Sequence, residues 1–430
     1  MQNVTLWRAV VGVEKTVVED IEFDEDEQLL VAHVRPWKRA RGRCGRCGRR
    51  SPAFDRGEGR RRWRALDLGT IQAVLEADAP RVRCLEHGPT VAAVPWARHA
   101  AGHTYAFDEQ VAWLATQCSR SAITELMRIA WRTVGAIITR VWADVEAVHD
   151  RFADLRRIGI DEIAYKRGQR YLTVVVDHDS GRLVWAAAGR EKATLERFFD
   201  ALGEQRCAQI THVSADGADW ISAVVVGRCP NAVRCADPFH IVKWATEALD
   251  EVRRQAWNAA RRRPGGRTDR SRWSRGHLRQ DATGNAKALK HARYALWKNP
   301  ENLTTRQQAK LAWIAKTDPT LHRAYLLKEG LRLVFQLGYE EAVEALQAWI
   351  GWARRCRIPT FVDLQRRIVK HKASILAAIE HGLSNGRIES VNTKIRLITR
   401  IAFGFKSSEA LIALAMLNLG GHRPTLPGRQ

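Results

Sequence analysis

The sequence predicts a mixed α/β protein in which a sheet domain is interrupted by an all-α insertion. Three observations carry this prediction. Apolar residues between 157 and 236 switch between strand and helix spacing, and those of 240–380 keep helical spacing almost throughout. Two pairs of metal-binding residue types precede both segments. The 430 residues support several domains, and the net charge of +23 favours a polyanionic partner, with nucleic acid as the first candidate.

The N-terminal region, residues 1–103, is predicted to combine short strands with a metal site. Residues 1–30 and 71–83 alternate apolar and polar residues as strands do. Between them, residues 35–64 hold 13 Lys or Arg against two acids. Such a stretch cannot fold on a core of its own and needs another source of order.

Metal binding would supply that order. Two pairs of soft ligands with close spacing are typical of a tetrahedral zinc site, namely Cys44-x-x-Cys47 and Cys84-x-x-His87. Unpaired buried thiols are the simpler alternative. If His87 is not the fourth ligand, the other candidates are His33, His99 and His103.

Residues 104–152 are predicted to form three short helices with tight turns. Apolar residues form one stripe on each helix: Phe107, Val111 and Leu114; then Ile123, Leu126 and Met127; then Val134, Ile137, Ile138 and Val141. Arginine and threonine residues on the third helix, including Thr139 and Arg140, are expected to face outward, which favours a helix-turn-helix over a plain bundle. The candidate DNA-binding residues are Ser121, Thr124, Arg132 and Thr133.

Residues 153–244 predict three strands in a meander, followed by helix–strand–helix–strand. This is the order of a ribonuclease H-like α/β domain. We expect residues 245–375 to form the helical insertion and residues 376–430 to return to the sheet. A basic loop in the insertion supplies further DNA-binding candidates: Arg261, Arg262, Arg263 and Trp273. The other tryptophans of the insertion are expected in its core.

Three carboxylates lie where this topology would bring them together. Asp161 lies among apolar residues of the first strand, Asp216 follows the fourth strand, and Glu389 lies on a late helix. The first and fourth strands are neighbours in such a sheet, and the late helix packs against them. Clustered oxygen ligands in a basic protein are what two Mg²⁺ ions need for phosphoryl transfer.

Nearby residues compete with these acids or support them. The competitors are Asp219 and Asp237 for the second position and Glu380 for the third. Asn392, three residues after Glu389, shares the same helix face. Lys394 and Arg396 could hold phosphates.

Five segments of the sequence together point to a known family: CGRCG…RVRC, IGIDE, SADGADW, PNAVRCADPFHIVK and SNGRIESVNTKIRLITRIAFGF. With the three-helix unit, they make the chain similar to bacterial insertion-sequence transposases of the ISL-three type along essentially its whole length. The resemblance implies a DDE transposase in which Asp161, Asp216 and Glu389 hold two Mg²⁺, or Mn²⁺, ions. It also implies supporting positions beside the active site for Asp237 and His240. The chain departs from the family's usual cysteine pair at His87.

The function that the resemblance implies is cutting and joining of DNA at the terminal inverted repeats of an insertion sequence. The expected partners are double-stranded end and target DNA and a second copy of the chain, because two ends must be brought together. No apolar run is long enough for a membrane span, so we expect a cytoplasmic bacterial protein that associates with the nucleoid. The alternatives are a non-catalytic zinc and helix-turn-helix regulator and a ribonuclease H-like structure-specific nuclease.

Overall fold

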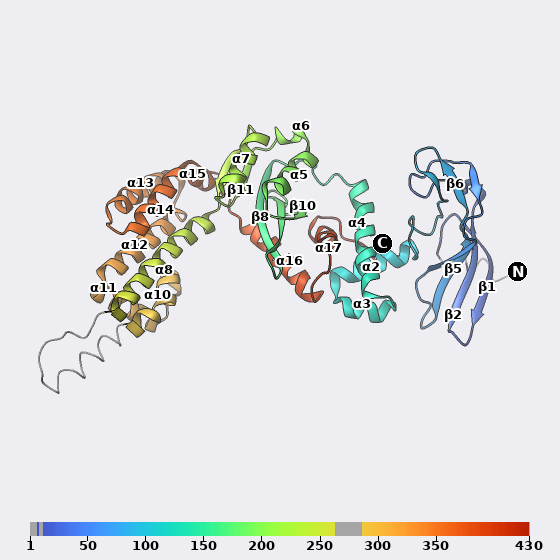
Figure 1. Ribbon diagram of the computed structural model, residues 1–430, viewed down its shortest axis with the longest axis horizontal. Helices are drawn as coiled ribbons and strands as arrows, with labels where there is room; N and C mark the ends of the chain where they lie inside the picture. Colours follow the sequence, from blue (N-terminus) through green and yellow to red (C-terminus); the bar gives the residue numbers. More distant parts are fainter. Residues whose placement is uncertain (1–6, 8–11, 263–285, 430) are drawn as a thin grey trace, which may run out of the picture. The chain divides into compact units, whose positions relative to one another are not determined.

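The computed structural model describes residue 7, residues 12–262 and residues 286–429 (Figure 1). The chain divides into two compact units, Phe152–Ile395 and a second unit made of Met1–Arg151 with Arg396–Gln430. Within the described residues, no helix is both long and apolar enough to cross a membrane.

The N-terminal part of the chain forms two small sheets. The first has the strand order β1-β2-β5-β4, with bounds Thr16–Asp24, Leu29–Pro36, Gln72–Asp78 and Arg60–Arg64. The second has the order β3-β6-β7, with bounds Ala53–Asp55, Arg81–Cys84 and Gly88–Val91. A short 3-10 helix, η1 (Lys38–Ala40), follows β2.

One expectation for this region needs correction. Residues 71–83 form two strands rather than one, because Pro80 falls between β5 and β6 and cannot donate to a strand ladder. The arginine-rich segment also contributes to a core: Trp63 of β4 is 2% exposed and packs edge-on against Trp96, with ring centroids 5.5 Å apart.

Three helices follow with the predicted short turns, α2 (Tyr105–Gln117), α3 (Arg120–Met127) and α4 (Trp131–Val148). The side chain of Ser119 caps α3 by accepting a hydrogen bond from the amide of Ala122. The predicted apolar stripes are buried, except that Leu114 is half-buried and Leu126 is 60% exposed.

The C-terminal helix packs against this three-helix unit. Helix α17 (Ser408–Leu419) contacts α4 and α2, and most of its apolar residues are buried. We expected all of residues 376–430 to return to the sheet, but the contacts divide that stretch after Ile395. The segment before α17 places Phe405 under the guanidinium of Arg120, whose carbon lies 4.1 Å from the ring centroid.

The α/β unit contains a five-stranded sheet of order β10-β9-β8-β11-β12. The antiparallel meander is β8 (Arg157–Lys166), β9 (Arg170–Asp177) and β10 (Leu183–Ala188), as predicted. The parallel strands are β11 (His212–Ala215), beside β8, and β12 (Val233–Ala236). The linking helices are α5 (Lys192–Leu202), α6 (Glu204–Cys207) and α7 (Asp219–Arg228). Helix α16 (Gly386–Ile401) packs on β8, where Ile388 lies against Gly159.

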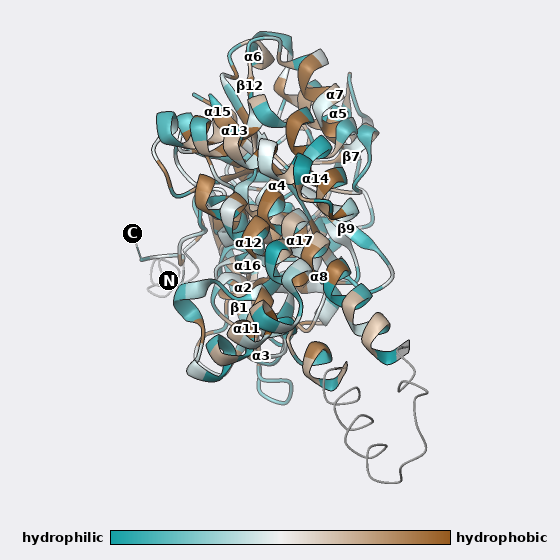
Figure 2. Ribbon diagram, turned by 90° about the vertical axis from the view of Figure 1, so that its left-hand side faces the viewer, coloured by the Kyte–Doolittle hydropathy of each residue, from teal (hydrophilic) through white to brown (hydrophobic). Residues whose placement is uncertain are grey.

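The described part of the insertion is helical, as predicted, and has one continuous core. It begins at the first residue of α8 (Pro238–Arg262), seven residues before the predicted boundary, and Figure 2 shows both hydrophilic and hydrophobic residues along this helix. The later helices are α10 (Arg293–Trp297), η2 (Pro300–Asn302), α11 (Thr305–Thr317), α12 (Pro319–Val334), α13 (Tyr339–Arg355), α14 (Pro359–Lys370) and α15 (Lys372–Glu380). Trp352 is 38% exposed, so one tryptophan expected in the core is not there.

The contact of Arg120 with Phe405 predicts that the C-terminal segment stabilises the three-helix unit. Arg120 is 4% exposed, and burial lowers the pKa of its guanidinium. Phe405→Ala would leave this cation without the ring and open a cavity, so we expect the opening free energy of α4 to fall by about 3 kcal/mol. Amide hydrogen exchange in α3 and α4 measures it. Phe403→Ala, at a residue 78% exposed, is the control, and equal exchange in both variants would contradict the prediction.

Candidate functional site

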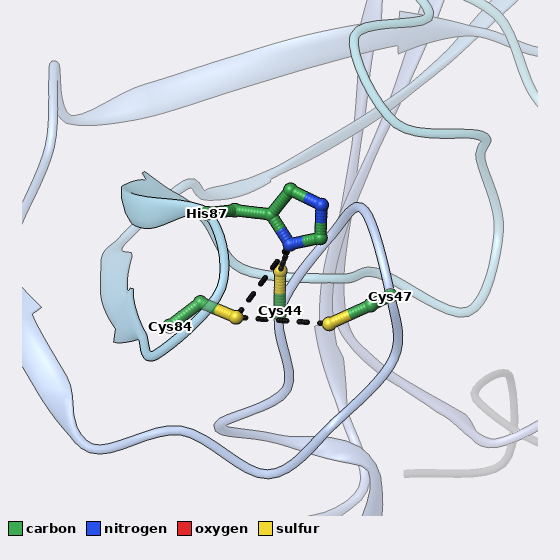
Figure 3. Close-up of side chains that lie close together, drawn as sticks. All are labelled: Cys44, Cys47, Cys84 and His87. Atoms are coloured by element: carbon green, nitrogen blue, oxygen red, sulfur yellow. Dashed lines mark hydrogen bonds between the residues drawn. The ribbon is translucent and has the colours of Figure 1, made fainter.

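The four predicted zinc ligands lie together, brought from the loop at Cys44 and Cys47 and from the β6–β7 hairpin (Figure 3). The sulfur atoms of Cys47 and Cys84 are 3.7 Å apart. Nδ1 of His87 lies 3.8 Å from Sγ of Cys44 and 3.6 Å from Sγ of Cys84. Among the described residues, this is the one group of three or more Cys, His, Asp or Glu whose ligand atoms all lie within 4.8 Å of one another.

These distances fit a tetrahedral zinc ion. Zn–S bonds of about 2.3 Å and Zn–N bonds of about 2.0 Å give tetrahedron edges of about 3.5 to 3.8 Å. Hydrogen bonds from the backbone and then the side chain of His87 lower the pKa of the Cys84 thiol to about 6, which favours the thiolate that binds metal. The amide of Arg46 also donates to Sγ of Cys44 at 3.4 Å.

The alternative histidines are not in the cluster. His33 lies near Glu22 and Glu76, and His103 stacks on Phe107 with ring centroids 4.9 Å apart. His99 packs beside Gly45, where an added side chain would collide with its ring. His87 is therefore the member that completes the set.

The candidate DNA-binding residues of the three-helix unit lie mostly at its surface. Ser121 on α3 and Arg132 in the first turn of α4 are exposed, while Thr124 and Thr133 are half-buried. The Thr124 hydroxyl donates to the backbone oxygen of Ser121 at 2.8 Å.

The other basic candidates lie in two places, on α4 and in the insertion. Arg140 does not face outward freely: it binds the fully buried carboxylate of Asp108 at 2.8 Å, because a buried charge needs a partner. In the insertion, Arg261 and Arg262 lie at the end of α8, and the Arg261 guanidinium lies over Trp257. Arg263 and Trp273 lie outside the described residues.

The candidate acidic site begins at Asp161, in the middle of β8. Its carboxylate accepts hydrogen bonds at 2.7 Å from Nδ2 of Asn392 and from the amide of Glu162. Burial raises the pKa of Asp161, and the negative charges of Asp237 and Asp216 raise it further. The helix carrying Glu389 is thus held directly on the strand carrying Asp161.

Asp216 follows β11 and faces a hydrogen-bonded pair. Oδ2 of Asp237, which is 3% exposed, lies 2.7 Å from Nδ1 of His240, and Nε2 of His240 lies 4.0 Å from Oδ2 of Asp216. The hydrogen bond to Asp237 raises the pKa of His240, with further contributions from the charges of Asp237, Asp216 and Asp161. Asp237 and His240 therefore lie beside the two candidate aspartates.

The remaining candidates lie on or near α16. Glu389 is exposed in its first turn, one turn before Asn392, and Lys394 and Arg396 are exposed further along. Within the described part of the chain, Asp161, Asp216 and Glu389 do not form a group with ligand atoms within 4.8 Å.

The structure also bears on the competing acids. Asp219 is bound by Nζ of Lys370 at 2.7 and 2.9 Å, and its side chain is 74% exposed. Glu380 is exposed at the last residue of α15. Neither acid has a contact that ties it to Asp161, whereas Asp216 contributes to the pKa shift of Asp161.

The sequence interpretation missed two polar residues near these acids. Burial, followed by the charge of Asp216, raises the pKa of Glu162 to about 7. Its place beside Asp161 in IGIDE was the available signal. Asn385, just before α16, is 1% exposed and hydrogen-bonded to Ser214 of β11. Its signal was an asparagine in front of the predicted Glu389 helix.

Comparison with known proteins decides the family. Residues 158–415 match the transposase region of the ISL3 type, residues 92–142 match the helix-turn-helix domain of transposase family ISL3, and residues 40–87 match the zinc-finger of the IS204/IS1001/IS1096/IS1165 transposases. The chain belongs to the ISL3 transposase family. The predicted helix-turn-helix and zinc-binding region are thereby confirmed as family features.

Two known transposases align with all or most of the chain. The transposase for insertion sequence element IS1557 of Mycobacterium tuberculosis, found in two strains, is 66% identical over 439 aligned positions, which cover 100% of this chain and 98% of the relative. The transposase for insertion sequence element IS1001 of Bordetella parapertussis is 26% identical over 399 positions, 91% of this chain and 92% of the relative.

The zinc cluster gives a prediction for metal content. We expect the purified chain to hold about one Zn²⁺, and Cys44→Ser to lose it because Cys44 supplies one of four ligands. Metal analysis of each variant measures this. Loss of metal should raise hydrogen exchange in β3, β6 and β7 but leave β8–β12 protected. Cys118→Ser, at a half-buried thiol outside the cluster, is the matched control; unchanged zinc in Cys44→Ser would refute the assignment.

Proposed function

We propose that the chain is a DDE transposase with a ribonuclease H-like catalytic domain, which binds the terminal inverted repeats of its insertion sequence and cleaves and joins DNA. The observation that carries the proposal is the direct hydrogen bond of Asn392 with Asp161, because it places the Glu389 helix on the central strand of the sheet. The strand order β10-β9-β8-β11-β12 and the family membership support it. A non-catalytic regulator would have no use for this arrangement of acids.

In this proposal Asp161, Asp216 and Glu389 hold two Mg²⁺, or Mn²⁺, ions. The residues fit such ions, because the negative charge of Asp216 is close enough to raise the pKa of Asp161, and a cation would relieve this. When bound, the ions would activate the attacking oxygen and offset the charge that develops on the phosphate. Asn392 orients the Asp161 carboxylate, and Asp237 orients His240 toward Asp216.

The other modules bind DNA in this proposal. Ser121, Thr124, Arg132 and Thr133 belong to the helix-turn-helix and contact the end sequence, and the zinc-binding region assists. Lys394, Arg396, and Arg261 and Arg262 at the end of α8 contact phosphates or bases, as do Arg263 and Trp273 of the basic segment. Phosphate contacts would make the affinity depend on salt. A homodimer is the smallest assembly that can pair two ends, and the bacterial cytoplasm with its nucleoid is the expected location.

The catalytic assignment predicts that Asp161→Asn, Asp216→Asn and Glu389→Gln each lower Mg²⁺-dependent nicking at an element end by about a thousandfold or more. Each change keeps the side-chain volume and removes the charge that holds a cation, so folding and end binding should persist. The measurement is nicking of a labelled end fragment, with binding measured in parallel. Asp219→Asn and Glu380→Gln are the controls. Near-normal nicking by Asp161→Asn would disprove the mechanism, while loss in Asp237→Asn with normal Asp216→Asn would move the second aspartate.

Sequence recognition makes a separate prediction. Arg132 is exposed in the first turn of α4, the place from which a recognition helix contacts base edges. Arg132→Ala should therefore weaken binding to the element end by about 1–3 kcal/mol and random DNA much less. Fluorescence anisotropy with both DNAs at one salt concentration measures the ratio. An equal loss on both would identify Arg132 as a phosphate contact instead.

A further inference from the structure

The Glu389 helix is far in sequence from the strands it must meet. Ser214 of β11 and Asn385, the residue before α16, are 171 positions apart, with the whole insertion between them. Helix α15, which packs on β12, ends at Glu380, shortly before α16 begins, so the chain returns near the sheet while its exact placement depends on further contacts. Direct contacts with the sheet have to fix its position.

Asn385 makes one of these contacts, and it is deeply buried. An asparagine in front of a helix usually caps it, with its side-chain oxygen accepting an amide hydrogen of the first turn. Here the backbone oxygen of Asn385 accepts from the amide of Glu389 at 2.8 Å, while its side-chain Oδ1 accepts from the Ser214 hydroxyl at 2.6 Å. The side chain is thus used to hold the helix to the sheet.

The hydrogen bonds continue from Ser214 to the end of β9. Nε2 of His178 lies 2.7 Å from Oγ of Ser214. His178, Ser214 and Asn385 are 4%, 0% and 1% exposed. Burial, and then the positive charges of Arg387 and Arg157, lower the pKa of His178 to about 4. The chain of three side chains is therefore uncharged at neutral pH, and buried hydrogen bonds of this kind define one geometry because breaking them leaves unpaired polar atoms.

The backbone of Asn385 also contacts Asp237, the residue that follows β12. Its amide donates to Oδ1 of Asp237 at 3.4 Å, and Oδ2 of the same carboxylate binds His240, which faces Asp216. Ser214 lies on β11, and Asp216 follows two residues later, just after the strand ends. One residue thus connects the start of the Glu389 helix to the strand of Asp216 and to the Asp237–His240 pair.

We propose that Asn385 is a positioning residue for the cleavage reaction: through Ser214 and Asp237 it sets where Glu389 stands relative to Asp161 and Asp216. This inference rests on the proposed function, since Glu389 acts there as a catalytic carboxylate. Asn385 itself touches no reacting atom. Its loss should displace the first turn of α16 without changing the helix-turn-helix that recognises the element end.

The test begins with two variants that break the same hydrogen bond from opposite ends. Asn385→Gly removes the side chain at a position where glycine is nearly as good a helix cap, and Ser214→Ala removes only a hydroxyl. Single-turnover nicking at saturating end DNA should fall between about tenfold and about a hundredfold in each, because small misplacement of a catalytic group costs that much. End-binding affinity should stay within about twofold, and the double variant should be no slower than the slower single variant.

A distance measurement separates positioning from general destabilisation. Spin labels, introduced as unnatural amino acids at exposed Thr393 on α16 and exposed Gln169 in the β8–β9 turn, report the placement of the helix on the sheet. The distance distribution should broaden or shift in Asn385→Gly and Ser214→Ala. Ser384→Ala, at the exposed neighbouring residue, should leave both rate and distance unchanged.

Each result decides between the two proposals. If Asp161→Asn and Glu389→Gln nick normally, the proposed function fails. If they are inactive while both Asn385→Gly and Ser214→Ala nick at the normal rate with unchanged distances, the positioning role is wrong. If Asn385→Gly does not fold, Ser214→Ala alone decides the test. Additive losses of nicking rate in the double variant would also refute the proposal that the two residues act through one hydrogen bond.

Discussion

The close approach of α16 to β8 is the constraint on which the candidate active site depends. A Cβ atom at Gly159 would lie 2.1 Å from Cδ1 of Ile388 and 2.9 Å from Nε2 of His178, so a larger residue would force these side chains to shift. Because glycine leaves that space, Ile388 packs directly on the strand. The next turn of the helix then carries Asn392 within 2.7 Å of Asp161. A polar contact central to the site is therefore positioned by an apolar one.

The candidate active site is acidic, whereas the whole chain carries a net positive charge. The protein carries a net charge of +23, yet acids gather in the middle of β8 and just after β11 and β12. Burial and the negative charges of neighbouring acids raise the pKa values of Asp161 and Glu162. The free protein therefore favours the protonated form of these carboxyl groups more than usual. A site with this property gains from binding a cation, while the surrounding positive charge attracts a polyanion. Both features suit chemistry on a DNA phosphate.

Local sequence patterns predicted most elements, since strand alternation, helical stripes and a serine cap act over a few residues. The paired spacing of Cys44, Cys47, Cys84 and His87 likewise predicted the zinc cluster that the structure forms. The failures concern contacts between distant segments. The sequence predicted an outward-facing Arg140, but in the structure it binds the buried Asp108. The sequence also assigned α17 to the sheet domain, but this helix packs on α4. Neither partner can be identified from spacing along the chain.

The insertion explains why buried polar contacts matter at α16. A flexible connection of this length would place little restraint on where its ends lie. The insertion does have a continuous core that includes Ala236 of β12 and Ile375 of α15, so it forms a solid body attached to one edge of the sheet. Helix α15 also packs on β12. The folded insertion brings the chain back near β12. Side chains of the α16 region that reach the sheet, such as Asn385 and Asn392, then fix how the helix carrying Glu389 is rotated and where it lies along the strands.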